Sequence, residues 1–212
     1  AFKELYDISE GLLRIADVAA ELPGAVAFTR QAAKLCTVSV GHTNCTYEEA
    51  AAVFDAGARH LTHLYNAMPG IHHRHPGPIG AASEREAVVA ELICDGHHVH
   101  PSAVRMAFRL FPGRICLISD ALRCCGMPDG QYTLGAAHLA DSTLAGSAAN
   151  LYDCMRKAVE FGIPKEQAIL SATLLPAREI GREHETGSIA VGKLADFVVC
   201  DENLNRKKVY MY

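Results

Sequence analysis

Short apolar segments rich in Val, Ile and Leu alternate along this chain with longer amphipathic segments. This alternation predicts strand–helix units around a parallel sheet, because the strands of such a sheet are buried on both faces and form nearly continuous apolar runs. Each apolar segment is followed by a polar or glycine-containing turn. The predicted strands cover residues 12–18, 36–42, 58–64, 88–96 and 114–121.

The segments between and after these strands carry the pattern of helices. Thr46 and Ser102 stand at the start of two of them, where a hydroxyl can satisfy a free backbone N–H group as an N-cap or first-turn residue. The last part of the chain, from Gly187 onward, returns to strand character. The predicted helices cover residues 23–34, 47–56, 102–110, 147–161 and 165–172.

Five parallel strands joined by helices predict an α/β fold, and specifically an incomplete (β/α)₈ barrel. A whole barrel of this kind needs about 250 residues, and this chain has 212. We therefore expect the chain to start partway into a domain. In such a barrel the active site is built from the C-terminal ends of the strands, so polar residues at those ends are the candidates for function.

Composition narrows the class of protein. The formal net charge is -4 and the apolar runs are strand-length, so we expect no membrane-spanning segment, and the lack of a basic stripe argues against nucleic acid as a partner. The first residues show no secretory signal. None of the eight cysteines forms a CxxC pair, which is typical of free thiols in a reducing cytoplasm.

Three histidines and one aspartate fall at the ends of successive predicted strands. His42, His63 and His98 each end a separate strand, and Asp120 ends the next one. Strand-end side chains of a barrel point into one mouth, and imidazole and carboxylate groups are the ligands and bases that zinc-dependent hydrolysis requires. One such histidine alone would most often be structural. Four in order favour a metal-dependent hydrolase.

The sequence motifs around these residues resemble those of a known enzyme family. The chain contains VGHTNCTYEEA, THLYNAMPGIHHRHPG, DGHHVHP, LISDA, TLAGS and GSIAVGKLADFVV. Together they resemble the N-acetylglucosamine-6-phosphate deacetylases, a branch of the amidohydrolase superfamily. THLYNAMP is specific to that branch, and the GK-ADFVV tail is found in amidohydrolases in general.

The resemblance implies a metal-dependent deacetylase acting on N-acetylglucosamine 6-phosphate, with the barrel of metal-dependent hydrolases in residues 1–186. Residues 187–212 would then contribute strands to a small β-sandwich. It implies a divalent metal, Zn²⁺ first and Fe²⁺ or another ion next, bound by His42 and His63. Asp120 is implied as the general acid/base, and His98 as the group that contacts the substrate and polarises its carbonyl. A cytoplasmic homodimer is implied as well.

The same resemblance implies a set of substrate-binding residues. Asn66 and Ala67 match positions that contact the sugar phosphate, and Arg74 matches a basic residue that pairs with it. A planar guanidinium suits a phosphate, which agrees with that role. Further implied contacts come from His98 with its neighbours Asp95 and Gly96, and from the turn formed by Leu144, Ala145, Gly146 and Ser147.

Two departures from the family pattern stand out. The carboxylate ligand belongs to an HLEGP-type word that is absent from this chain, so His42 and His63 form an incomplete metal site. Glu21, in AAELPG, occupies a different position, and we interpret it as structural. The passage from Gly135 to Leu144 is also shorter than in the family, where a hairpin or flap occupies it.

Two other functions remain open at this stage. Another amidohydrolase, such as a dihydroorotase-like cyclic amidase, would share the barrel and the metal and lack the phosphate pocket. A catalytically incomplete barrel could serve as a scaffold without enzymatic activity. THLYNAMP with the downstream Arg74 argues against the first, and the joint presence of His42, His63 and Asp120 argues against the second.

Overall fold

The computed structural model describes residues 1–122, 125 and 146–212. Its main feature is one sheet of parallel strands that follow one another in chain order. All five predicted strands are confirmed, and each is shorter than the range predicted for it. They are β1 (Ile15–Val18), β2 (Thr37–Val40), β3 (His60–Leu61), β4 (Val89–Ile93) and β5 (Ile115–Ile118).

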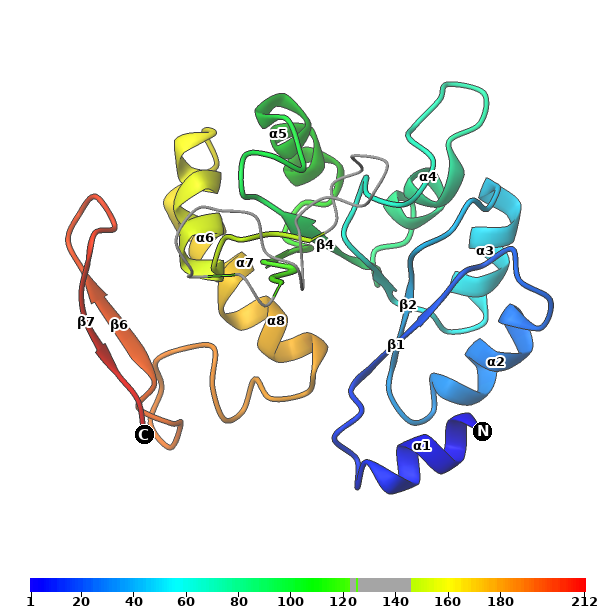
Figure 1. Ribbon diagram of the computed structural model, residues 1–212, viewed down its shortest axis with the longest axis horizontal. Coiled ribbons are helices and arrows are strands. Elements are labelled where there is room, and N and C mark those ends of the chain that lie inside the picture. Colours follow the sequence, from blue (N-terminus) through cyan, green and yellow to red (C-terminus); the bar gives the residue numbers. More distant parts are fainter. Residues whose placement is uncertain (123–124, 126–145) are drawn as a thin grey trace.

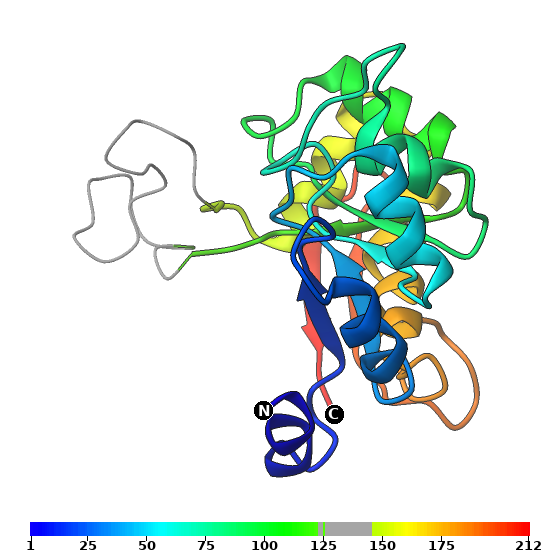
Figure 2. The ribbon, with the colours of Figure 1, turned by 90° about the vertical axis from the view of Figure 1, so that its right-hand side faces the viewer.

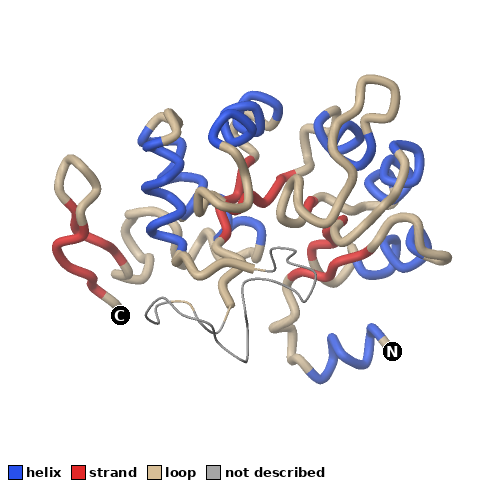
Figure 3. Tube along the Cα trace, turned by 45° about the horizontal axis from the view of Figure 1, so that its top comes forward, coloured by secondary structure: helices blue, strands red, loops and turns tan. Residues whose placement is uncertain are grey.

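Helices cover the outer face of this sheet, and Figures 1 and 3 show them in an arc outside the strands. Five of them match predicted helices: α2 (Ala25–Ala32), α3 (Tyr47–Asp55), α5 (Pro101–Leu110), α6 (Leu151–Glu160) and α7 (Lys165–Ala172). Three others were not predicted: α1 (Phe2–Ile8), α4 (Gly77–Ser83) and α8 (Leu174–Glu179). These three are short, and two of them contain proline, so their sequences lack a clear helical period.

The helix starts follow local capping chemistry. At the start of α3, the Thr46 hydroxyl accepts the N–H of Glu49, and the Glu49 carboxylate accepts the N–H of Thr46, which forms a capping box. At the start of α5, the cap is His100, whose side chain accepts the N–H of Ser102 at 3.2 Å. Ser102 therefore lies in the first turn of α5, one of the two places predicted for it.

The two faces of the sheet differ in polarity because side chains alternate along a strand. Val38, Val40, Leu61, Leu92 and Leu117 are buried in the apolar core that the helices cover. Residues at the alternate positions include Ser39, His60 and Glu91 and point to the other face, which is the inner face of a barrel. The α/β fold and the partial barrel are thus confirmed, and only part of the barrel wall is present.

The segment after β5 differs from the prediction at one point. Ser147 was predicted to begin a helix, but it forms a parallel β-bridge with Ala121, and α6 begins only at Leu151. Asn150 caps that helix by accepting the N–H of Asp153 at 3.0 Å. Ser147 consequently lies beside the end of β5, at the mouth of the sheet.

The C-terminal strands form a second, two-stranded sheet. β6 (Phe197–Cys200) pairs antiparallel with β7 (Arg206–Tyr210), and Figure 1 shows this hairpin beyond α6. Strand character in the tail is confirmed, and its place in a β-sandwich stays a prediction. In the view of Figure 2, α1 lies at the end of the sheet where β1 begins, opposite to α5. In the described ranges, none of the helices is both long and apolar enough to cross a membrane.

Candidate active site

Three of the predicted functional residues share an unusual backbone conformation at equivalent positions. His42, His63 and Asp120 each follow the last residue of a strand by two positions, and their φ angles are 46°, 31° and 46°. Residues other than glycine rarely adopt such positive φ values, and those that do so cluster at functional sites. The fold therefore holds these three side chains at the C-terminal mouth of the sheet at some conformational cost.

The two histidines meet directly. Their Nε2 atoms lie 2.8 Å apart, and the two rings meet edge to face with centroids 4.5 Å apart. His63 is 5% exposed and its Nδ1 has no hydrogen-bond partner in the described part of the chain, whereas His42 is exposed. Burial and the neighbouring His42 lower the pKa of His63. A neutral imidazole is the form that binds a metal ion, so both the geometry and the electrostatics suit one.

The fit to a metal is partial in this chain. Two zinc-bound nitrogens at about 2.0 Å from the ion would lie about 3.3 Å apart in a tetrahedral site, close to the separation of these two atoms. A catalytic zinc site has three protein ligands. Across the described residues, no group of three or more His, Cys, Asp or Glu side chains is placed to hold a metal ion. His42 and His63 thus supply two ligands of such a site.

His98 is held by a buried carboxylate. Its Nδ1 lies 2.7 Å from Oδ2 of Asp95, and the same carboxylate accepts the N–H groups of His97 and His98 through Oδ1. The hydroxyl of Ser147 donates to Oδ2 at 2.8 Å. Burial alone would raise the pKa of Asp95, but these hydrogen bonds outweigh it and lower the pKa to about 2. Asp95 is therefore an ionised acceptor that orients the His98 ring.

Asp120 presents an exposed carboxylate at this mouth. Burial has the largest effect on the pKa of His63 and lowers it, while the charge of Asp120 acts in the opposite direction. The backbone of Asp120 is fixed by Ser147, whose N–H donates to the Asp120 carbonyl at 2.8 Å. A carboxylate in this place can accept and return a proton beside a metal ion.

A cavity of about 480 Å³ opens beside His42. Ala67 lines it and also joins two turns, because its carbonyl accepts the N–H of Thr43 at 3.0 Å. Asn66 stabilises its own turn by donating to the carbonyls of His63 and Leu64, each at 3.2 Å. The complete lining consists of Glu21, His42, Thr43, Asn44, Ala67, Met68 and Pro69.

Glu21 has a larger part in this cavity than the sequence indicated. Its carboxylate accepts the Thr43 hydroxyl and the N–H of Asn44, the latter at 2.8 Å. These hydrogen bonds lower the pKa of Glu21 against the opposing effect of its partial burial. Glu21 thus fixes the turn that follows His42 and also faces the cavity. Its position shortly after the end of β1 was the signal for such a role.

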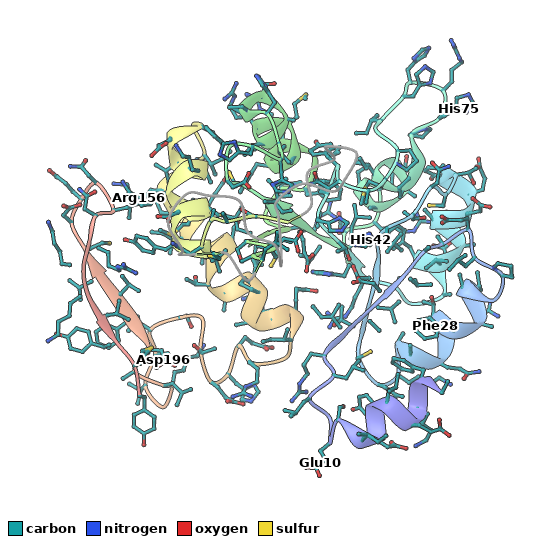
Figure 4. The ribbon with its side chains drawn as sticks, in the orientation of Figure 1. Glu10, Phe28, His42, His75, Arg156 and Asp196 are labelled. Carbon is teal, nitrogen blue, oxygen red and sulfur yellow. The ribbon has the colours of Figure 1, made fainter. Side chains whose placement is uncertain are left out.

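Arg74 does not lie with the other predicted site residues. Its guanidinium contacts Nε2 of His73 at 2.8 Å in an exposed loop, and it is absent from the cavity lining. Figure 4 shows His75, the next residue, at the tip of that loop and far from His42. Gly96 lies next to Asp95 with a φ of 88°. Leu144 and Ala145 lie outside the described residues, as do all residues from Gly135 to Leu144.

A row of polar side chains below the site was not predicted. Thr62 donates to Asp17 at 2.5 Å and contacts the Ser39 hydroxyl at 2.6 Å on the inner face of the sheet. Next to this row, His60 is fully buried, and burial lowers its pKa to about 4. Burial raises the pKa of Glu91, 3.8 Å from His60, to about 7. Polar residues at every second position of the strands could have predicted this row.

The chain is similar to known proteins in both sequence and structure. Residues 14–211 match the model of the amidohydrolase family. The chain is 38% identical to an N-acetylgalactosamine-6-phosphate deacetylase of Escherichia coli, with 98% of this chain and 58% of the relative covered. It is 39% identical to the N-acetylglucosamine-6-phosphate deacetylase of Vibrio furnissii, with 82% and 46% covered.

A solved structure agrees with these relatives. It shows a variant of the N-acetyl-D-glucosamine-6-phosphate deacetylase of Mycobacterium smegmatis in complex with N-acetyl-D-glucosamine-6-phosphate. The TM-score is 0.91 at 36% identity, with 99% of this chain and 59% of that chain covered. The chain thus spans about half the length of the relatives it matches.

Proposed function

The chain belongs to the amidohydrolase family, and from this premise we propose that the full-length protein hydrolyses the acetamide of N-acetylglucosamine 6-phosphate. The products are glucosamine 6-phosphate and acetate. The observation that carries the proposal is the pairing of the His42 and His63 Nε2 atoms, 2.8 Å apart, at the strand-end mouth where Asp120 takes the equivalent position after β5. The names of the relatives supply the class of substrate.

We assign His42 and His63 as two ligands of a divalent metal ion, with Zn²⁺ as the first choice and Fe²⁺ as the second. Neutral imidazole nitrogens suit both ions. A third protein ligand lies outside this chain, on the upstream carboxylate word that the family resemblance implies. When bound, the metal ion lowers the pKa of a bound water toward about 7 and polarises a carbonyl oxygen.

The chain's own side chains complete the chemistry. Asp120 takes the proton of the attacking water and returns it to the leaving amine. His98 presents Nε2 to the acetamide oxygen, because its Nδ1 is held by Asp95. A hydrogen bond to that oxygen strengthens as negative charge develops in the transition state. The turn with Asn66 and Ala67 lines the cavity side where we place the sugar phosphate.

We further propose that the protein works as a homodimer in the cytoplasm. The family resemblance supports the dimer. Free thiols persist in a reducing compartment, and all seven cysteines in the described ranges are free: Cys36, Cys45, Cys94, Cys116, Cys125, Cys154 and Cys200.

The experiment is acetate release by the full-length protein from N-acetylglucosamine 6-phosphate and, separately, from its galactose epimer. Each is measured as purified, after treatment with a chelator, and after zinc re-addition. We expect release that the chelator abolishes and zinc restores. Faster turnover of the galactose epimer would assign the protein to the function named for its Escherichia coli relative.

Two outcomes contradict the proposal. Turnover of dihydroorotate or hydantoin without acetate release would identify a cyclic amidase. A purified protein with less than about a tenth of an equivalent of metal, and inactive with added zinc, would be a scaffold, since a site with three protein ligands binds zinc strongly.

A further inference from the structure

Ser147 connects two parts of the site that lie on different strands. Its side chain and backbone are buried, with 2% of the residue exposed. The hydroxyl donates to Oδ2 of Asp95 at 2.8 Å. The N–H donates to the Asp120 carbonyl at 2.8 Å, and the carbonyl accepts the N–H of Leu122 at 2.9 Å. One residue therefore contacts both the carboxylate that orients His98 and the backbone of Asp120.

Both oxygens of the Asp95 carboxylate accept hydrogen bonds from groups within the protein. Oδ1 accepts the N–H groups of His97 and His98 at 2.8 and 3.0 Å. Oδ2 accepts from Nδ1 of His98 at 2.7 Å and from the Ser147 hydroxyl at 2.8 Å. An ionised carboxylate offers about four acceptor sites, and here four donors occupy them. Asp95 is thus a partner of His98 and has no acceptor left for a sugar hydroxyl.

This arrangement also sets the tautomer of His98. Because an ionised carboxylate can only accept, we assign the shared proton to Nδ1 of His98. Nε2 is then the nitrogen that remains for a ligand. Without the Ser147 hydroxyl, the Asp95 carboxylate would lose one of the two donors that fix Oδ2, and the His98 ring would lose part of its orientation.

The close approach of Ser147 to Asp120 depends on the residue before it. Gly146 has a φ of 74°, and a Cβ atom there would lie 2.7 Å from Cγ of Leu122 and 3.1 Å from the Asp120 carbonyl oxygen. The first contact is shorter than real Cβ atoms show and the second is tight, and the positive φ also favours glycine at this turn. The local chain is therefore built to bring Ser147 against the end of β5.

We propose that Ser147 is a positioning residue that holds the Asp95–His98 pair in a fixed place relative to Asp120. This inference rests on the proposed function, in which His98 and Asp120 act on the same acetamide. It gives Ser147 a role other than the substrate contact that the family resemblance implies for the turn from Leu144 to Ser147. The hydroxyl is buried and donates to Asp95, so it acts on the substrate only through His98.

The test uses the full-length, metal-loaded protein with Ser147→Ala. The substitution removes the hydroxyl, which also accepts the N–H of Ala149 at 3.0 Å. The backbone hydrogen bonds to Asp120 and Leu122 stay in place. We expect kcat to fall about ten-fold and KM to stay within about two-fold, since one hydrogen bond to a charged group is lost. The matched control is Ser171→Ala, which deletes another buried serine hydroxyl, on α7, and should leave kcat unchanged.

A double-mutant cycle separates positioning from a merely structural role. In an Asp95→Asn background, Ser147→Ala should lower kcat by less than about two-fold, because residues that act through one another are not additive. A further ten-fold fall in that background would overturn the proposal. So would a rise in KM at unchanged kcat for Ser147→Ala alone, since that result indicates a direct substrate contact.

A measurement that does not depend on enzymatic activity separates the positioning role of Ser147 from the proposed function. The ¹⁵N-labelled imidazole Nδ1–H resonance of His98 should shift in Ser147→Ala and stay in place in Ser171→Ala. An unchanged resonance overturns the positioning role even if the wild type releases no acetate, which itself would overturn only the proposed function. If Ser147→Ala does not fold, Ser147→Cys keeps a weaker donor of similar size, and its kcat and resonance should move part of the way.

Discussion

At the scale of single residues, the candidate site depends on backbone conformations that are costly for ordinary side chains. His42, His63 and Asp120 all adopt positive φ two residues after a strand. A turn of this kind brings the side chain over the end of the strand instead of along it. The sequence predicted that these residues would meet, because strand ends share one mouth. It could not predict the left-handed turns, which no glycine marks.

Asp120→Asn is the direct test of the acid/base role. The substitution keeps the shape of the side chain and removes its ability to take a proton. We expect kcat to fall by about 10² to 10⁴, as for other general acid/base groups, with the metal content unchanged. Metal analysis and acetate release on the same preparation check both parts. Asp7→Asn on the exposed helix α1 is the control, and normal turnover in Asp120→Asn would remove the residue from the mechanism.

Asp95 makes stability depend on pH in an acidic window. Its pKa is about 2 in the folded protein and near 3.8 in an unfolded chain, so the unfolded state binds more protons between these values. The stabilisation is present above pH 3.8, amounts to about 2 kcal/mol, and is lost as the pH falls through about 2. Roughly half should be gone at pH 3.

Urea unfolding at pH 6 and pH 3 measures this effect. The wild type should lose more unfolding free energy between the two pH values than Asp95→Asn, by about 1 kcal/mol. Equal losses in both proteins would mean that the Asp95 carboxylate is not the ionised acceptor that the hydrogen bonds indicate.

At the scale of elements, the apolar period predicted all five strands of the sheet and five of the helices. The helix α4 escaped prediction because its sequence, GPIGAAS, has two glycines and a proline that suggest a loop. Ser147 was assigned to a helix, whereas it pairs with Ala121 and Asn150 caps α6. In each case a tertiary contact decided the local structure. Periodicity alone does not contain that information.

The contact between β2 and β3 gives a prediction at this scale. Gly41 packs against Thr62, and a Cβ atom on Gly41 would lie 2.6 Å from the Thr62 Cβ. Thr62 cannot easily move, because its hydroxyl is bonded to Asp17 and Ser39. Gly41→Ala should therefore lower the free energy of unfolding by about 1 to 3 kcal/mol, the usual cost of overpacking.

Thermal and urea unfolding check this value. The control is Gly70→Ala, because a Cβ atom there meets nothing within 4 Å, and we expect it to change stability by less than about 0.5 kcal/mol. Gly41→Ala should also weaken metal binding, since Gly41 precedes His42 and Thr62 precedes His63. Wild-type stability in Gly41→Ala would show that the two strands separate more readily than their polar contacts suggest.

At the scale of the whole molecule, the ends of separate strands bring the proposed catalytic residues to one mouth, while Arg74, the residue proposed to bind the phosphate, lies in an exposed loop. The sequence predicted this arrangement only in part. It identified Arg74 through the words around it, but no local pattern tells where a loop of this kind will project. The cavity beside His42 has Glu21 and no Lys or Arg in its lining. A cation that pairs with a phosphate bound there would come from another part of the protein.

Arg74→Ala decides whether this loop supplies that cation. A charge-assisted contact to phosphate contributes about 1.5 to 3 kcal/mol, so KM for the phosphorylated sugar should rise about 10- to 100-fold with little change in kcat. The unphosphorylated N-acetylated sugar should be turned over equally by both proteins, because it has no group for the guanidinium. Arg109→Ala, an exposed arginine on α5, is the control. An unchanged KM would exclude Arg74 from the site and leave the phosphate to residues outside this chain or to backbone N–H groups near Ala67.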